Sequence, residues 1–325
     1  MPFKYDNNHI IPSKDESDDR SSVSSEPSSE KTNNKPVNLN FQITHPKYTM
    51  DNLILSDDVL DSLTTIICAH QCWKKVFFDW NLKSVLGDRQ NLFVNLYGEP
   101  GTGKTMAAHA IAHSLNKDIL CVNYAEIESK YVGETGKNLN ELFRYAASSD
   151  VILFFDEADA FLSKRVTNMN NSTDVSVNQT RSVLLTLLND YSGMVIFASN
   201  FIANYDAAFM RRIQYHVKFE LPNAELRERL WKRYIPSEMP AQLNYKQIAE
   251  KYDKISGSDI SNAVLSAALK AAKHNNAAVD QSLFEDAIIG ILKSKDANKG
   301  YTVTSRPVTE EYAMNQIKKT EGDKL

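Results

Sequence analysis

The run from Gly98 to Thr105 has the residue types and the spacing of a phosphate-binding loop. Its sequence, GEPGTGKT, fits the pattern G-x-x-x-x-G-K-[ST] in full. Glycines let the backbone curl so that its N–H groups face phosphate oxygens, and the N-terminal end of the following helix adds partial positive charge. Lys104 would reach the β- and γ-phosphates, and the Thr105 hydroxyl would bind Mg²⁺. The residues predicted to bind a nucleotide here are Gly98, Glu99, Pro100, Gly101, Thr102, Gly103, Lys104, Thr105 and Met106.

Two acids, Asp156 and Glu157, directly follow the apolar run Val151–Phe155. Acids at the end of a buried strand are costly unless they have a function. Beside a phosphate-binding loop, Asp156 would hold Mg²⁺ and Glu157 would polarise an attacking water. The alternative is that both acids only cap the next helix. Asp159 and Glu134 are interpreted as ordinary solvated acids.

Asn200 and the pair Arg211-Arg212 are further candidate catalytic residues. Asn200 follows the apolar run Val195–Ala198 and would reach the γ-phosphate or the attacking water, although an asparagine at a strand end is more often a turn residue. The two arginines precede another apolar run and are either a solvated surface pair or fingers on a neighbouring subunit's γ-phosphate. Such a finger is worth on the order of 10³ to 10⁵ in rate.

These residues need a scaffold that brings them together, and the sequence predicts an α/β domain over residues 46–221. Apolar runs rich in β-forming residues alternate there with helical stretches, which is typical of a parallel sheet covered by helices on both faces. The five predicted strands are Leu92–Tyr97, Ile119–Val122, Val151–Phe155, Val195–Ala198 and His216–Phe219. The expected fold class is the five-stranded parallel α/β fold of P-loop nucleotide hydrolases.

A small all-α lid domain is predicted over residues 222–296, beginning at Pro222. Its expected helices are Ala224–Tyr234, Tyr245–Tyr252, Ser258–His274 and Gln281–Lys293. Ser258 and Asp259 are interpreted as N-terminal caps of the third helix. Residues 1–45 are Ser-rich and poor in large apolar groups, so they are predicted to be a disordered tail, and residues 297–325 a C-terminal tail with one helix or none.

Composition excludes several classes of protein. The chain has 325 residues, a formal net charge of -4 and a pI of about 6.0, which argues against nucleic acid as a partner. No apolar run approaches the ~20 residues of a membrane helix, and the first 20 residues lack the apolar core of a secretory signal. We expect a cytoplasmic protein.

The cysteines are few and odd in number, which argues against a disulfide framework. Cys68, His70 and Cys72 lie close together, but a four-ligand zinc site needs more partners. Cys68 and Cys72 are four residues apart on a predicted helix and are expected to share one packing face.

Taken together, the motifs resemble the AAA family of ATPases, in the clade that includes katanin, spastin and the ESCRT-disassembling ATPase. The resemblance covers about residues 46–295. GEPGTGKT matches Walker A, with Glu99 where proline is usual, and VILFFDEADAF matches Walker B. Ser199-Asn200 matches sensor 1, Asp206–Arg212 the arginine-finger segment, and Ser256–Ile260 the sensor 2 region, where Gly257 and Ser258 would lie near the adenine.

A further match is the segment Ser129–Glu134, which resembles pore loop 1. In the family this loop projects an aromatic residue into the channel of a hexamer, here Tyr131 flanked by Lys130 and Val132. The alternative is a turn with a half-buried tyrosine. Two departures stand out: the Asn-rich stretch Val166–Val177 occupies the place of pore loop 2, and Asp51–Ser56 lacks the glycine usual near the adenine.

The resemblance implies a homohexameric ATP hydrolase that uses ATP and Mg²⁺. It would couple hydrolysis to the remodelling, unfolding or disassembly of a protein substrate by threading. An alternative is an ATP-dependent switch acting on a separately encoded partner effector without threading, which suits a tail that has no folded recruitment domain. A nucleic-acid motor is a third hypothesis, and the acidic balance disfavours it.

Overall fold

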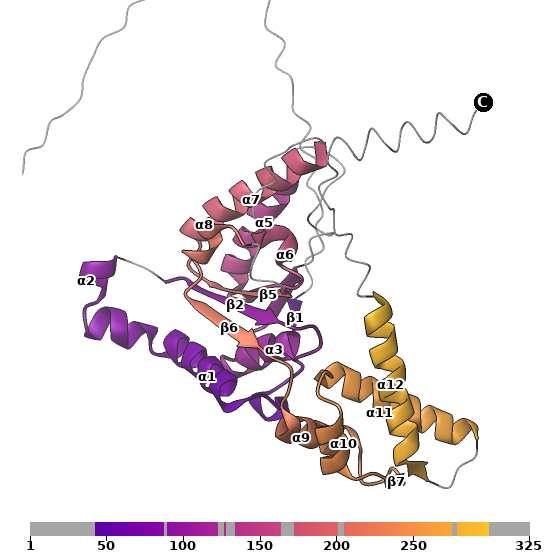
Figure 1. Ribbon diagram of the computed structural model, residues 1–325. Coiled ribbons are helices and arrows are strands. Elements are labelled where there is room, and N and C mark those ends of the chain that lie inside the picture. The colour runs from indigo at the N-terminus through magenta and orange to yellow at the C-terminus, as the bar shows by residue number, and fades with distance from the viewer. Residues whose placement is uncertain are drawn as a thin grey trace, which may run out of the picture. The chain divides into compact units, whose positions relative to one another are not determined.

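A computed structural model of the chain describes residues 43–87, 90–122, 127, 134–163, 172–200, 205–274 and 278–298. Its main feature is a sheet of six strands in the order β1-β3-β4-β5-β2-β6 (Figure 1). The strands are β1 (Ile43–Thr44), β2 (Leu92–Gly98), β3 (Ile119–Val122), β4 (Ile152–Phe155), β5 (Met194–Ser199) and β6 (Tyr215–Phe219).

The five predicted strands all form and pair in parallel, so the predicted fold class is confirmed. The sixth strand was not predicted. β1 pairs antiparallel with β3, with Ile43 opposite Leu120 and Thr44 opposite Ile119. Its two residues fall within the range predicted as a tail, so the sheet begins earlier in the chain than the sequence indicated.

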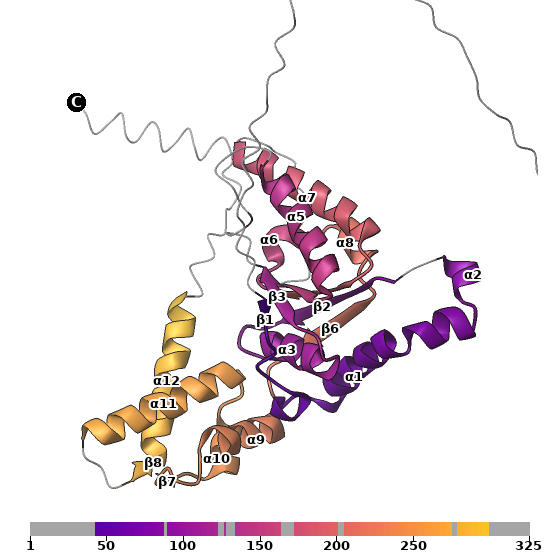
Figure 2. The same cartoon turned by 180° about the vertical axis from the view of Figure 1, so that it is seen from behind.

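Helices cover both faces of the sheet, as expected for a mostly parallel sheet whose central strands are buried (Figure 2). On one face lie α1 (Asp57–Gln71) and α3 (Lys104–Ser114). On the other lie α5 (Glu134–Ser149), α6 (Asp159–Leu162), α7 (Ser172–Asp190) and α8 (Ala207–Met210). A 3-10 turn (Met50–Asn52) precedes α1, and a π-helical turn (Lys75–Asp79) with α2 (Lys83–Leu86) follows it.

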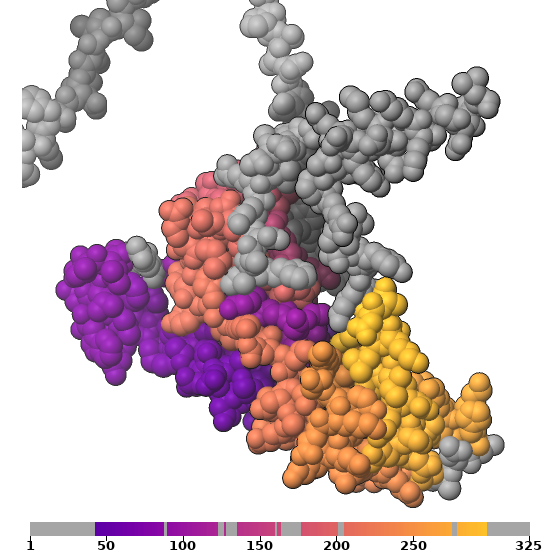
Figure 3. All heavy atoms as spheres, in the orientation of Figure 1, coloured from indigo at the N-terminus to yellow at the C-terminus, as the bar shows by residue number. Residues whose placement is uncertain are grey.

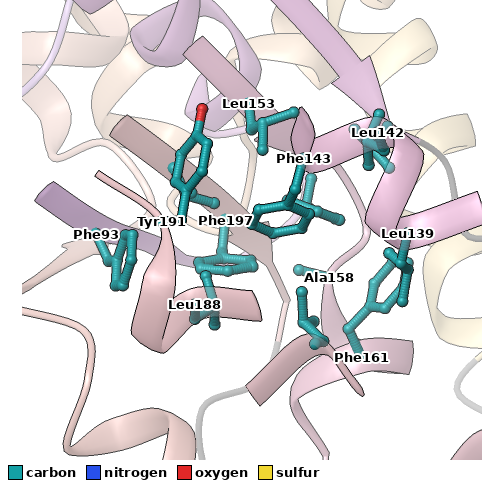
Figure 4. Packing of buried hydrophobic residues seen from close by; sticks show 14 of the residues in the cluster. Phe93, Leu139, Leu142, Phe143, Leu153, Ala158, Phe161, Leu188, Tyr191 and Phe197 are labelled. Carbon is teal, nitrogen blue, oxygen red and sulfur yellow. The ribbon is translucent and has the colours of Figure 1, made fainter. Parts of the chain in front are cut away.

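Aromatic rings fill the core between the sheet and α5–α7. Figure 4 shows Phe143 of α5, Phe161 of α6 and Phe197 of β5 in one cluster. The Phe155 ring stacks on Phe197 with centroids 5.2 Å apart and meets the Phe161 ring edge-on, also at 5.2 Å. Phe155 is fully buried, so the strand that ends at the predicted catalytic acids is fixed by ring packing on this face.

The C-terminal part of the described chain is helical. It contains α9 (Ala224–Tyr234), α10 (Tyr245–Lys251), α11 (Gly257–Lys273) and α12 (Gln281–Asn298), with the short parallel pair β7 (Ala241–Gln242) and β8 (Val279–Asp280). Trp231 and Phe284 are both fully buried at its centre, with ring centroids 5.8 Å apart. These helices start and end within a few residues of the predicted ranges.

The predicted cap of α11 is corrected. Ser256, not Ser258, is the N-cap, because its Oγ accepts a hydrogen bond from the Asp259 backbone N–H. Asp259 stands at the third helical position and accepts in turn from the Ser256 backbone N–H at 2.6 Å, which completes a capping box.

The two cysteines at the C-terminal end of α1 lie on one face, as expected, but that face is not a buried packing face. Cys68 is exposed and Cys72, which ends the helix, is only partly covered. Their sulfurs lie 3.4 Å apart. Across the residues that the structure describes, no group of three or more His, Cys, Asp or Glu is placed to hold a metal ion. None of the described helices is long and apolar enough to cross a membrane.

Candidate functional site

The predicted phosphate-binding loop joins β2 to α3, as its sequence context indicated. Gly98, Gly101 and Gly103 have positive φ angles of 140°, 74° and 103°, which only glycine adopts easily. Gly103 is the left-handed N-cap of α3. The Thr102 hydroxyl closes the turn by donating to the Glu99 carbonyl oxygen at 2.7 Å. The loop therefore brings the free N–H groups at the start of α3 to the edge of the sheet.

Lys104 lies inside this loop with only 8% of its surface exposed. Its ammonium donates to the carbonyl oxygens of Gly98 at 2.8 Å and Glu99 at 2.9 Å, and to Asn200 Oδ1 at 3.1 Å. Burial lowers the pKa of Lys104, and the carboxylates of Asp156, Asp159 and Glu99 oppose that shift. A buried cation held by neutral oxygens is well placed to exchange some of them for phosphate oxygens.

The acids predicted after β4 lie beside the loop. Asp156 Oδ2 accepts from the Thr105 hydroxyl at 3.2 Å, and Asp156 Oδ1 accepts from the Glu157 backbone N–H at 2.9 Å. Neither acid caps α6, whose N-cap is Ala158. Glu157 is exposed and has φ 51°, a left-handed conformation that is uncommon outside glycine. Strain of this kind persists where the surroundings enforce it, often at functional positions.

Asn200 follows β5, which lies between β2 and β4, so its side chain reaches Lys104. Its backbone N–H donates to Asp159 Oδ2 at 3.0 Å. The interpretation of Asp159 as an ordinary solvated acid was therefore wrong, because this carboxylate fixes the backbone of the predicted sensor residue. The sequence signal was weak, since Asp159 and Asn200 are far apart in the chain and meet only because β4 and β5 pair.

A cavity of about 890 Å³ lies against the loop. Its lining comes from the segment before α1, from the phosphate-binding loop, from the end of β6 and from the helical lid. In Figure 3 the indigo atoms of the first of these segments adjoin the orange atoms around α9. The size suits a nucleotide. Among the predicted nucleotide-binding residues, Gly101–Met106, Gly257 and Ser258 line it.

The lid contributes to this cavity through a direct contact with the loop. The Ser258 backbone N–H donates to the Gly101 carbonyl oxygen at 3.2 Å. Leu55 and Ser56, from the segment that lacks the glycine usual near the adenine, also line the cavity. Tyr48 and Tyr234 do so as well and were not foreseen, because nothing in their spacing marks them as ligand contacts.

Mg²⁺ fits the oxygen pair formed by Thr105 and Asp156. A hydroxyl and a carboxylate 3.2 Å apart match the preference of Mg²⁺ for oxygen, with phosphates and water completing the shell. The ion would neutralise charge on the phosphates. The protein itself supplies few ligands, which is typical of Mg²⁺ in phosphoryl-transfer sites.

The two predicted finger arginines differ in their surroundings. Arg212 is held by its own chain, with Nε donating to Asn189 Oδ1 and Nη1 to the Ala208 carbonyl oxygen, both at 2.8 Å. Arg211 is exposed, and its Nε donates to the Ala207 carbonyl oxygen at 3.2 Å. Neither lines the cavity of its own chain. The predicted pore residues Lys130, Tyr131 and Val132 lie outside the described residues.

Residues 94–221 match the family described as "ATPase family associated with various cellular activities (AAA)". This chain contains an AAA ATPase domain. The match spans the loop at Lys104, the acids after β4, Asn200 and both arginines. The predicted AAA family is confirmed at the level of this domain.

Two of the proteins that this chain is similar to are named as 26S proteasome regulatory subunits. A "26S proteasome regulatory subunit 8 homolog" of Schizosaccharomyces pombe is 32% identical over 222 residues, covering 66% of this chain and 55% of that protein. "26S proteasome regulatory subunit 4 homolog B" of Arabidopsis thaliana is 34% identical over 202 residues, covering 60% and 45%. This chain spans about half the length of these relatives. They do not single out the clade of katanin and spastin.

Proposed function

We propose that the protein is a ring-forming ATPase that couples Mg-ATP hydrolysis to the remodelling, unfolding or disassembly of a protein substrate by threading. The observation that carries the proposal is the meeting of Lys104, Thr105, Asp156 and Asn200 at one edge of the sheet, beside a cavity of nucleotide size. The relatives are named as regulatory subunits of the 26S proteasome, which favours a protein substrate over nucleic acid.

Each residue has a distinct role in the proposed hydrolysis. Lys104 binds the β- and γ-phosphates, while Thr105 and Asp156 hold Mg²⁺. Glu157 accepts a proton from the attacking water, and Asn200 orients that water or the γ-phosphate. Arg211 and Arg212 of the next subunit stabilise the charge that develops on the γ-phosphate. The family resemblance favours six identical subunits.

Two inactive variants together are expected to restore ATP hydrolysis, because the proposed site is shared between subunits. Arg211→Ala is expected to bind ATP but lose turnover by on the order of 10³ or more. Glu157→Gln is expected to be inactive for a different reason. In a mixed ring, an Arg211→Ala subunit that keeps Glu157 can meet a Glu157→Gln subunit that keeps Arg211. Phosphate release should therefore be partly recovered on mixing.

Each variant measured alone provides the control for that experiment. Full activity of Arg211→Ala alone would show that the finger assignment is wrong. Absence of recovery in rings shown by mass to contain both subunits would show that the site is not shared.

Threading is tested separately at Tyr131. Tyr131→Ala is expected to keep ATP hydrolysis but to lose ATP-dependent unfolding of casein, a loosely folded protein probe. The reason is that the proposed role of Tyr131 is to grip the substrate polypeptide. Tyr131→Phe keeps the aromatic side chain and is expected to retain the unfolding activity. Unfolding by Tyr131→Ala at the unmodified rate would reject threading and support the switch on a partner effector.

A further inference from the structure

An ion pair connects the end of α12 to the start of α11. Lys295 Nζ contacts Asp259 Oδ2, and the two side chains are 38% and 11% exposed. The same carboxylate oxygen accepts from the Ser256 backbone N–H at 2.6 Å and from the Ser256 hydroxyl at 2.7 Å. Three donors thus converge on one oxygen of a nearly buried acid, and they fix the position of its side chain at the start of α11.

The helix start that Asp259 organises lies against the phosphate-binding loop. The Ser258 backbone N–H donates to the Gly101 carbonyl oxygen at 3.2 Å. The approach is close, since a Cβ placed on Gly101 would lie 2.6 Å from Ser256 Oγ and 2.9 Å from Ser258 Cβ. A shift of the Ser256 cap would therefore move a neighbour of the loop that binds phosphate.

The connection spans segments that are distant in sequence. Both ribbon views show α11 and α12 crossing each other (Figures 1 and 2). Lys295 stands in the last turn of α12, 36 residues after Asp259. One side chain thereby ties the last described helix to the cap that touches Gly101.

We infer that Lys295 is a positioning residue for nucleotide binding, acting through Asp259 and the Ser256 cap on the phosphate-binding loop. The inference rests on the proposed ATP site and adds to it a control point outside the cavity. Without the ammonium, the Asp259 carboxylate remains buried and lacks its counter-charge. It is then expected to turn toward solvent, release Ser256 and loosen the contact between Ser258 and Gly101.

The test compares three variants of the full chain by anisotropy of a fluorescent ATP analogue with Mg²⁺. Lys295→Met keeps most of the length of the side chain and removes the charge, and is expected to weaken binding about tenfold, within the usual range of coupling between sites. Lys295→Arg keeps the charge and is expected to stay within about threefold. Lys293→Met removes an exposed lysine two residues away and is expected to bind like the unmodified protein.

A double-mutant cycle identifies the path. If Lys295 acts through Asp259, adding Lys295→Met to Asp259→Asn should weaken binding much less than Lys295→Met does alone. Urea unfolding of each variant distinguishes an effect on stability from an effect on nucleotide affinity. A loss of stability with unchanged affinity would overturn the inference, as would additive effects on affinity in the cycle.

Two remaining outcomes are also decisive. If Lys295→Met does not fold, Lys295→Gln takes its place, because an amide can still donate to Asp259 without charge. Binding by Lys295→Gln equal to that of Lys295→Arg would then overturn the role of the charge. Failure of the unmodified protein to bind the analogue at all would reject the proposed function instead, so the two failures are distinguishable.

Discussion

Glu157→Gln is expected to bind ATP with nearly unchanged affinity and to hydrolyse it on the order of 10² to 10⁴ times more slowly. Glutamine has the same shape but cannot accept the proton of the attacking water. The backbone of Glu157 is fixed independently of its carboxylate, through the bond from its N–H to Asp156 and the bond from the Ala158 N–H to the Ala198 carbonyl oxygen at 2.8 Å. The substitution should leave the loop and the proposed Mg²⁺ ligands in place.

The measurement is a single-turnover assay of phosphate release beside equilibrium binding of a fluorescent ATP analogue. Glu225→Gln is a matched control, because this exposed acid in the first turn of α9 is outside the site. Turnover by Glu157→Gln at the rate of the unmodified protein would show that Glu157 is not the general base. Lost binding together with lost turnover would instead assign Glu157 to nucleotide binding.

Gly98→Ala is expected to destabilise the protein by roughly 4 kcal/mol or more. A loss of stability this large is expected only where a substitution causes a specific steric conflict. Gly98 ends β2 opposite Phe219 of β6 and has φ 140°. A Cβ at this position would overlap the Phe219 carbonyl oxygen and lie 2.8 Å from its carbonyl carbon. Because the obstacle is backbone, β6 would have to move away from β2, and the start of the phosphate-binding loop would move with it.

Gly87 provides a control that separates backbone strain at positive φ from the steric contact with Phe219. Gly87 also has a positive φ, 74°, but a Cβ there meets nothing within 4 Å. Gly87→Ala should therefore show the backbone strain alone, about 1–3 kcal/mol. Urea unfolding of both variants gives the comparison. Equal destabilisation by the two substitutions would show that the contact with Phe219 contributes nothing.

The features that the sequence predicted best are those that depend on residues close together in the chain. The five parallel strands are apolar runs, and the loop at Lys104 is a contiguous pattern whose glycines take the expected positive φ angles. β1 could not be found this way, because two residues carry no periodic signal and its pairing with β3 is long-range. The partner of Asp159 was missed for the same reason: Asn200 is 41 residues away.

Two other misses were of different kinds. The capping box of α11 is written in the sequence as Ser256 followed three residues later by Asp259, so a local rule would have placed the cap correctly. Arg211 and Arg212 are adjacent and look alike in sequence. Only the structure shows that Arg212 is held within its own chain, by Asn189 and by the Ala208 carbonyl oxygen.

The position of β5 between β2 and β4 has a consequence for folding. Lys104 follows β2, Asp156 follows β4 and Asn200 follows β5, so the site cannot exist until the latest of these strands has inserted between the two earlier ones. Contacts between such distant segments form slowly, because a long loop must close before they stabilise the chain. A nucleotide that binds only the completed edge would hold the inserted strand in place and favour the folded state by mass action. Nucleotide binding would therefore also stabilise a late step in the folding of this protein.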